Sequence, residues 1–241
     1  MQCVLMRFDA PLMSFGGVLV DQHNPTEPFP ARSMLTGLVG NALGYAHRDA
    51  VLLDELQTRI TFAARWDVEP QFLRDYHTAD LGQSHLARAG WTTRGITEHR
   101  GGGSAKTGTH QRLRYYWANG VLTVALSVGE GSPDAEAIAG ALEMPARPLF
   151  LGRKTCLPAC RILLGVREAR SVLAALRGEP LSERGEPQQS LRACWPPSCG
   201  LEGADPRQQI RTADLRAWGA QVHVGGSELV VGTLQGIPPC T

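Results

Sequence analysis

The chain has 241 residues, of which 43% are apolar and 20% are charged, and its formal net charge is +1. This composition excludes a disordered, collagenous or coiled-coil chain. The longest uncharged apolar stretch, 33–46, is shorter than the ~20 residues of a membrane-spanning helix. The first strand-like segment carries Arg7 and Asp9 with no basic residue ahead of it, unlike a secretory signal. We therefore expect a cytoplasmic protein without a membrane segment.

Six cysteines do not indicate a disulfide framework here, because the cytoplasm keeps thiols reduced. Cys156 and Cys160 are four residues apart and Cys194 and Cys199 five, whereas a zinc site favours the C-x-x-C spacing. The sequence contains no phosphate-binding loop, metalloprotease motif or nucleophile elbow. We therefore expect neither a cofactor nor a metal ion.

Two segments are basic. The formal charge is +4 over 76–117 and +5 over 145–170. The first segment also holds four of the seven histidines and five aromatic residues, namely His77, His85, His99, His110, Tyr76, Trp91, Tyr115, Tyr116 and Trp117. Cations for phosphates, interleaved with rings on which bases stack, are typical of a surface that binds single-stranded nucleic acid. A solvated loop is the alternative explanation of the charge.

The first half of the chain alternates between strand and helix patterns. Apolar residues in alternation predict a strand over 3–8. Ser33 is the predicted N-cap of a glycine-rich helix, whose glycines would let another backbone come close. A second helix over about 49–57 leads into a strand over 60–66, which again alternates.

The pattern continues with a strand over 122–128, a helix capped by Asp134 and a strand over 162–166. Strand, helix, strand, strand, helix, strand is the order of the ferredoxin-like motif, which RRM-like domains share. No RNP1 sequence is present, so RNA would have to be bound through loops. We expect an α+β fold of this class.

The basic segment 76–117 is then a long insertion between the second and third strands. Connections of this length in a compact domain are usually functional or disordered. We therefore expect this one to form a projecting thumb. Strand-like pieces at 221–224 and 228–234 predict a small β-rich ending. The expected domains are a ferredoxin-like RNA-binding domain, 1–168, which contains the thumb, and a small C-terminal β-rich domain, 169–241.

Four segments carry a family resemblance. They read PLMSFG at 11–16, FPARS at 29–33, DYHT at 75–78 and PLFLGRKTC at 148–156. In this order they resemble the CasD subunits of the type I-E CRISPR surveillance complex, Cascade, which belong to the repeat-associated mysterious protein superfamily. The resemblance covers about residues 2–166 and is weak beyond them.

The resemblance implies a non-catalytic, RNA-binding subunit that holds the 5′ handle of the CRISPR RNA (crRNA) in antiviral defence. It implies that the subunit caps the filament of CasC backbone subunits, contacts the large subunit CasA and meets target DNA only through the complex. In related type I-C systems the corresponding subunit processes repeat RNA, so a metal-independent endoribonuclease, with His77 as general base and Lys154 stabilising the developing charge, is the alternative. A purely protein-docking subunit is a second alternative. Met13 and Phe15 are expected to dock a neighbouring subunit.

Four candidate RNA-binding residues lie in the second and the fourth of these segments. Arg32 and Ser33 begin the predicted helix, where free backbone N–H groups and the helix dipole favour a phosphate. Their alternative role is simple capping by Ser33 beside a solvated Arg32. Arg153 and Lys154 follow Gly152, which permits a close approach to a sugar-phosphate backbone. Their alternative is an ordinary surface turn.

Five further candidates lie at the two ends of the predicted thumb. Tyr76 and His77 open it, where a ring could stack on a base and an imidazole could donate to a phosphate. Arg112, Arg114 and Tyr115 return from it into the next strand. These three could face RNA, or they could only flank that strand.

Overall fold

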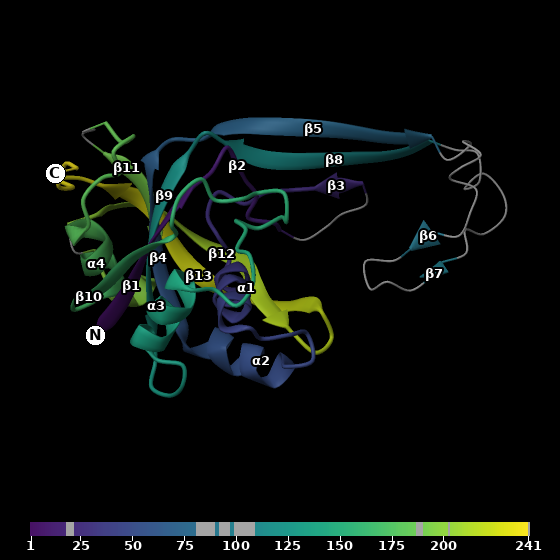
Figure 1. Cartoon of the computed structure of the whole chain (residues 1–241). Helices are drawn as coiled ribbons and strands as arrows, with labels where there is room; N and C mark the ends of the chain where they lie inside the picture. Colours follow the sequence, from purple (N-terminus) through teal and green to yellow (C-terminus); the bar gives the residue numbers. More distant parts are fainter. Residues whose placement is uncertain are drawn as a thin grey trace.

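The structure is a computed structural model that describes residues 1–17, 22–80, 90–91, 97–98, 109–186, 190–201 and 203–240. Its elements are Gln2–Asp9 (β1), Leu12–Met13 (β2), His23–Asn24 (β3), Arg32–Leu43 (α1), Ala50–Arg59 (α2), Ile60–Val68 (β4), Gln71–Asp80 (β5), Gly90–Trp91 (β6), Thr97–Glu98 (β7), Thr109–Ala118 (β8), Val121–Val128 (β9), Ala135–Glu143 (α3), Leu163–Glu168 (β10), Val172–Gly178 (α4), Leu191–Trp195 (β11), a 3-10 turn at Pro197–Cys199, Asp205–Ala217 (β12) and Val222–Leu234 (β13). The predicted α+β class is confirmed (Figure 1).

Seven antiparallel strands form the main sheet, in the order β10-β1-β9-β4-β11-β13-β12. Helices α1 and α3 cover one face and α4 covers the other. Along β1, Val4, Met6 and Phe8 enter the core beneath α1 and α3, whereas Cys3 and Leu5 enter the core beneath α4. Both faces of the predicted first strand are therefore buried, which explains why apolar residues occupy both sides of its alternation.

The four predicted strands are present as β1, β4, β9 and β10, and they lie next to one another in the sheet. Helices α1 and α2 connect β1 to β4, and α3 lies between β9 and β10. Strand β11 extends this group, with Cys194 paired to Ala64 of β4, and β13 and β12 follow it. The two predicted strand pieces near the C-terminus are one strand, β13, and its partner β12 was not predicted because polar residues dominate it.

The first residues of helices α1 and α3 can be compared with the predicted N-caps. Helix α1 begins at Arg32 after Ala31, so the prediction of Ser33 as its N-cap is wrong. The extended backbone of Ala31 (φ −75°, ψ 154°) leads directly into the helix, and no side chain caps it. Asp134 caps α3 as predicted, accepting a hydrogen bond from the amide of Ala137 at 2.8 Å.

At Gly37 and Gly40 the neighbours of the glycine-rich helix α1 are side chains, whereas another backbone reaches its last turn, where the amide of Ala146 donates to the carbonyl oxygen of Ala42 at 2.9 Å. A Cβ on Gly37 would lie 3.3 Å from the Trp218 ring, and one on Gly40 would lie 2.5 Å from the Leu53 side chain. These contacts bring the end of β12 and helix α2 against α1. Among the helices that the structure describes, none is both long enough and apolar enough to cross a membrane.

Strands β5 and β8 form a two-stranded ribbon that projects from the main sheet (Figure 1). The ribbon comes between β4 and β9 in the sequence, and β2 and β3 pair with the other edge of β8. Most of the predicted thumb tip, including 81–89, 92–96 and 99–108, lies outside the described residues. Met13 and Phe15 are fully buried near the base of the ribbon. Their expected docking role is therefore wrong, because both side chains belong to the core.

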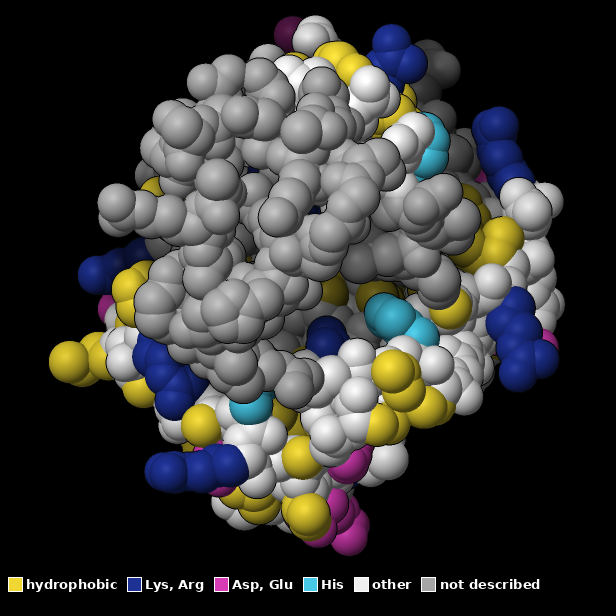
Figure 2. Space-filling model, turned by 90° about the vertical axis from the view of Figure 1, so that its right-hand side faces the viewer, with side chains coloured by type: hydrophobic (Ala, Val, Ile, Leu, Met, Phe, Trp, Pro, Cys, Tyr) yellow, Lys and Arg dark blue, Asp and Glu magenta, His cyan; other side chains and the backbone are white. Residues whose placement is uncertain are grey.

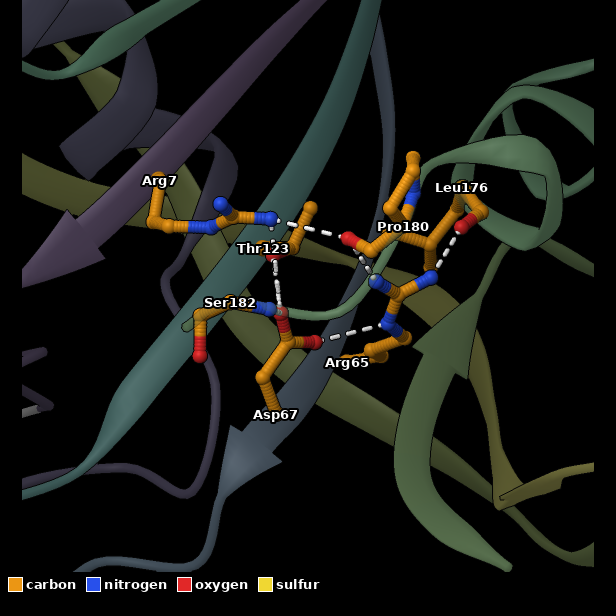
Figure 3. A network of polar contacts seen from close by, with 7 residues as sticks. All are labelled: Arg7, Arg65, Asp67, Thr123, Leu176, Pro180 and Ser182. Carbon is orange, nitrogen blue, oxygen red and sulfur yellow. Dashed lines mark hydrogen bonds and ion pairs between the residues drawn. The ribbon is translucent and has the colours of Figure 1, made fainter. Parts of the chain in front are cut away.

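A buried ionic network fixes the chain after α4 to the sheet (Figure 3). Arg65 and Asp67 of β4 are fully buried, and Arg65 Nε donates to Asp67 Oδ1 at 2.7 Å. Asp67 Oδ2 accepts hydrogen bonds from Thr123 Oγ1 and from the amide of Ser182, each at 2.9 Å, and lies 3.6 Å from Arg7 Nη2. Arg65 also donates to the carbonyl oxygens of Leu176 and Pro180. The buried charges are thus paired and hydrogen-bonded, as burial requires.

Candidate nucleic-acid interface

Two of the resemblance segments, far apart in the sequence, meet beside the ribbon. The amide of Ser14 donates to the carbonyl oxygen of Leu151 at 3.1 Å, and Ser14 Oγ donates to the carbonyl oxygen of Tyr115 at 3.2 Å. Gly152 has φ +97°, and a Cβ there would collide with the Ser14 carbonyl oxygen. The glycine is therefore required both by the backbone conformation and by the contact.

Arg153 holds the base of the ribbon. Its guanidinium donates to the carbonyl oxygens of Tyr115 at 3.0 Å and Asn24 at 2.8 Å. It also lies over the Tyr116 ring, 4.7 Å from the centroid, in cation–π geometry. No carboxylate pairs with it in the described part of the chain, so its positive charge stays un-neutralised.

A cleft of about 1110 Å³ lies beside this junction. Its lining brings together three of the predicted residues, Ser33, Arg153 and Lys154. The ionisable nitrogen-bearing side chains along it are Arg147, Arg153, Lys154, Arg216, His47 and His223, and no acidic side chain is among the described residues that line it. Figure 2 looks onto this side of the molecule and shows basic (dark blue) and histidine (cyan) side chains in and around a hollow. Such a lining favours an anionic ligand.

The start of α1 forms one wall of the cleft. Helix α1 has no acidic residue in its first turn, so nothing there offsets the positive end of its dipole. Ser33 is 7% exposed and lines the cleft. Arg32 is partly buried and is not among the lining residues, and its Nε is buried without a partner among the described residues.

The other five predicted residues lie on the ribbon, outside the lining of the cleft. The strand register places His77 directly opposite Arg112, with Arg114 on the same face. Tyr76 and Tyr115 lie on the opposite face. The Tyr76 side chain is 54% exposed, so its ring is accessible to a ligand.

Two pairs of polar side chains on the ribbon contact each other. The imidazole Nε2 of His77 contacts the Asp75 carboxylate, and Arg112 Nε donates to His110 Nε2 at 2.8 Å. His77 is not among the residues that line the cleft, whereas Lys154 is. The two residues that a ribonuclease mechanism would combine are thus not both part of the lining of the cleft.

Tyr115 is the middle member of a stack of rings across the ribbon. Phe72 from β5 stacks on one side at 5.5 Å between centroids, and His23 from β3 stacks on the other at 6.2 Å. The Tyr115 hydroxyl also bonds His23 Nδ1 at 3.0 Å. The Tyr115 ring is therefore half-buried and held in place by Phe72 and His23, whereas the rings of Phe72 and Tyr76 on this face of the ribbon are exposed.

Four basic residues of the cleft were not predicted from the sequence. Arg147 donates to the carbonyl oxygens of Gly44 (2.7 Å) and Tyr45 (2.6 Å) at the end of α1, and its place in the basic segment 145–170 was the available signal. No charged segment or motif marks the other three, His47, Arg216 and His223, because the fold alone brings their segments together.

Comparison with known proteins agrees with this architecture. The chain aligns with two solved CRISPR structures along nearly its whole length. One, described as a CRISPR RNA-guided surveillance complex, gives a TM-score of 0.68 at 24% identity and covers 99% of this chain and 91% of that chain. The other, described as a Cas protein, gives a TM-score of 0.61 at 22% identity and covers 98% of this chain and 95% of that chain. The fold is therefore that of a CRISPR-associated protein.

The sequence identifies the family more closely. Residues 3–229 match the family described as CRISPR-associated protein (Cas_Cas5). The Cascade subunit CasD of Escherichia coli (strain K12) is 31% identical over 185 residues, which cover 72% of this chain and 75% of that protein. The chain belongs to the Cas5 family of CRISPR-associated proteins, as the resemblance in the sequence predicts.

Proposed function

We propose that this chain is a non-catalytic subunit of a type I-E Cascade that binds the 5′ handle of crRNA. In this role it caps the filament of CasC backbone subunits, contacts CasA and meets target DNA only through the complex, in the cytoplasm, during antiviral defence. Its sequence identity of 31% to the E. coli Cascade subunit CasD supports the assignment. The observation that carries the RNA-binding role is the cleft beside the Ser14–Gly152 junction, whose described lining is basic and free of acidic side chains.

The strand order supports a ferredoxin-like, RRM-like interpretation of the first domain, 1–168. The four strands β10-β1-β9-β4 are antiparallel neighbours, with helices between β1 and β4 and between β9 and β10. This is the arrangement that two split β-α-β units produce. The β5–β8 ribbon is the thumb in this interpretation, and 169–241 is the C-terminal β-rich domain that lengthens the same sheet.

The placement of His77 and Lys154 favours binding over cleavage. A general base must lie within hydrogen-bond reach of the attacking 2′-hydroxyl, and the developing charge must be stabilised at the same phosphate. His77 contacts Asp75 on the ribbon, whereas Lys154 lines the cleft. The cleft lining therefore holds Lys154 without the histidine that the ribonuclease alternative needs as its general base, which favours a binding role for this residue.

The test uses the full chain, repeat-derived RNA and EDTA. Fluorescence anisotropy measures binding, and a denaturing gel measures cleavage in the same mixtures. Lys154→Ala is the informative variant, because Lys154 is exposed and lines the cleft, whereas Arg153 also supports the ribbon. Arg207→Gln is the matched control, since Arg207 is exposed on β12 and does not line the cleft.

We expect intact RNA, binding that weakens steeply with salt and a lower affinity for Lys154→Ala than for Arg207→Gln. Site-specific cleavage that disappears in His77→Ala would overturn the proposal in favour of a processing endoribonuclease. Absence of RNA binding by the wild-type chain, or equal affinity of the two variants, would leave a protein-docking subunit instead.

A further inference from the structure

The cleft has a second basic end, built around the tip of the β12–β13 hairpin. We call this the hairpin end, defined by the lining residues Arg147, Arg216, Trp218, His47 and His223. Helix α1 has 12 residues and is therefore about 18 Å long. Its first turn lies at the other end of the cleft, and its last turn receives the hydrogen bonds from Arg147. The cleft thus follows the helix between two groups of cations.

Arg216, like Arg147, is a cation of the hairpin end that no carboxylate pairs with in the described part of the chain. Its guanidinium lies 5.3 Å from the centroid of the Trp218 ring and donates to the side-chain and backbone oxygens of Gln221 at 2.6 and 3.4 Å. Its Nε is buried without a hydrogen-bond partner among the described residues, and no carboxylate pairs with it there. Burial lowers the pKa of the Arg216 guanidinium, because the charged form is desolvated. A phosphate in the cleft would neutralise this charge.

The surrounding structure holds Arg216 in a fixed position. The Gln57 side chain donates to the Arg216 carbonyl oxygen at 2.9 Å and accepts from the Arg216 amide at 3.1 Å. The amide of Trp218 donates to Asp54 Oδ1 at 3.2 Å, and the Trp218 ring packs against Gly37 of α1. The hairpin tip is therefore anchored to both α1 and α2, and Arg216 is preorganised before a ligand arrives.

The size and the charge of the cleft define its ligand. Its volume of about 1110 Å³ exceeds the ~300–1,000 Å³ of sites for single small molecules. Each lining arginine, Arg147, Arg153 and Arg216, bonds only to neutral oxygens in the described structure. A polyanion that follows α1 would contact all three, whereas a single phosphate would reach one end only.

We propose that the hairpin end is a second contact site for the phosphate backbone of the single-stranded RNA, with Arg216 as its principal contact. This inference rests on the proposed function and extends the RNA path beyond Ser33 and Lys154. The hairpin thereby takes part in binding, although no sequence motif marks it.

The test compares Arg216→Gln with Arg207→Gln, in the full chain, by fluorescence anisotropy over a range of salt concentrations. With a long repeat-derived RNA, we expect Arg216→Gln to lower the affinity roughly tenfold and to reduce the salt slope by about one phosphate contact. With an RNA too short to span the cleft, the loss should be smaller. Arg207→Gln should match the wild-type chain with both RNAs.

The outcomes separate this inference from the proposed function. If the wild-type chain binds RNA and Lys154→Ala weakens binding, but Arg216→Gln equals Arg207→Gln, the hairpin site is excluded and the proposed function stands. If the wild-type chain binds no RNA, both fail. Photocrosslinking of 4-thiouridine RNA to the wild-type chain requires no folded variant. Crosslinks to peptide 215–223 are expected, and their absence from a bound complex would overturn the inference.

Discussion

The carbonyl oxygen of Ser14 occupies the space in which any residue other than glycine would place its Cβ at position 152. The two residues are 138 positions apart in the sequence, yet their contact joins the loop after β1 to the loop that carries Arg153 and Lys154. The cleft and the base of the ribbon both depend on this junction, because Arg153 contacts Tyr115 and Asn24 from it.

Gly152→Ala should therefore destabilise the protein. The left-handed backbone at φ +97° costs about 1–2 kcal/mol for alanine, and displacing the Ser14 backbone adds about 1–3 kcal/mol. Urea unfolding measures the sum. Gly140→Ala is the matched control, because Gly140 is exposed in α3 with no atom within 4 Å of the added Cβ. That change should stabilise the chain by about 0.5–1 kcal/mol. Equal effects of the two substitutions would contradict the steric account.

Asp67→Asn tests the buried network. The substitution removes the negative charge that faces Arg65 and Arg7, and it leaves a fully buried guanidinium without its counter-ion. We expect a loss of about 3–5 kcal/mol in the free energy of unfolding. The control is Glu143→Gln, which breaks the exposed pair with Arg161 and should cost at most about 1 kcal/mol. A small effect of Asp67→Asn in urea titrations would show that the network contributes little.

Local patterns predicted much of the fold, because their signals lie within a few residues. The alternation over 3–8, the cap at Asp134 and the strand over 122–128 needed no distant partner. Ser33 was assigned the wrong role because residues of the cap type also occupy the first turn, and only the extended backbone of Ala31 decides the start. The sequence does not predict strand β12, because most of this strand is exposed and its residues do not alternate between apolar and polar.

The cleft was predicted only in part, for a related reason. Arg153 and Lys154 stand in a motif, and the fold places them beside Ser33. Arg216 enters the same cleft because Gln57, 159 residues earlier, holds its backbone. Such a tertiary contact leaves no mark in the composition or spacing of either segment, so the sequence could not predict it.

Tyr76 and Tyr115 are both candidate RNA-binding residues, but their rings have different environments in the structure. Tyr115 is half-buried and packs against Phe72 and His23, whereas Tyr76 is 54% exposed. Stacking of a base on a free ring contributes about 1–3 kcal/mol. Tyr76→Leu should therefore weaken RNA binding by roughly fivefold or more, and Tyr115→Phe, which keeps the stack, should not change it. Fluorescence anisotropy with the same RNA distinguishes the two, and the reverse ranking would refute the assignment.

The buried thiol of Cys3 should make stability depend on alkaline pH. Burial, the largest cause, raises its pKa from 9.0 to about 11. Above pH 9 the unfolded chain loses this proton while the folded chain retains it until about pH 11. The unfolded state then binds fewer protons, so the contribution of Cys3 to stability is complete below pH 9 and falls by about 1.4 kcal/mol per pH unit within that window.

Other groups titrate in the same window, so the measurement is a difference between two chains. Urea unfolding of the wild-type chain and of Cys3→Ala, from pH 8 to pH 11, removes the contributions that both share, including that of Cys194, whose pKa burial also raises. The wild-type curve should fall more steeply with pH above 9, whatever constant cost the missing thiol adds to Cys3→Ala. Parallel curves would mean that the Cys3 thiolate forms as readily in the folded protein as in the unfolded chain, and that the core beneath α4 does not exclude water from it.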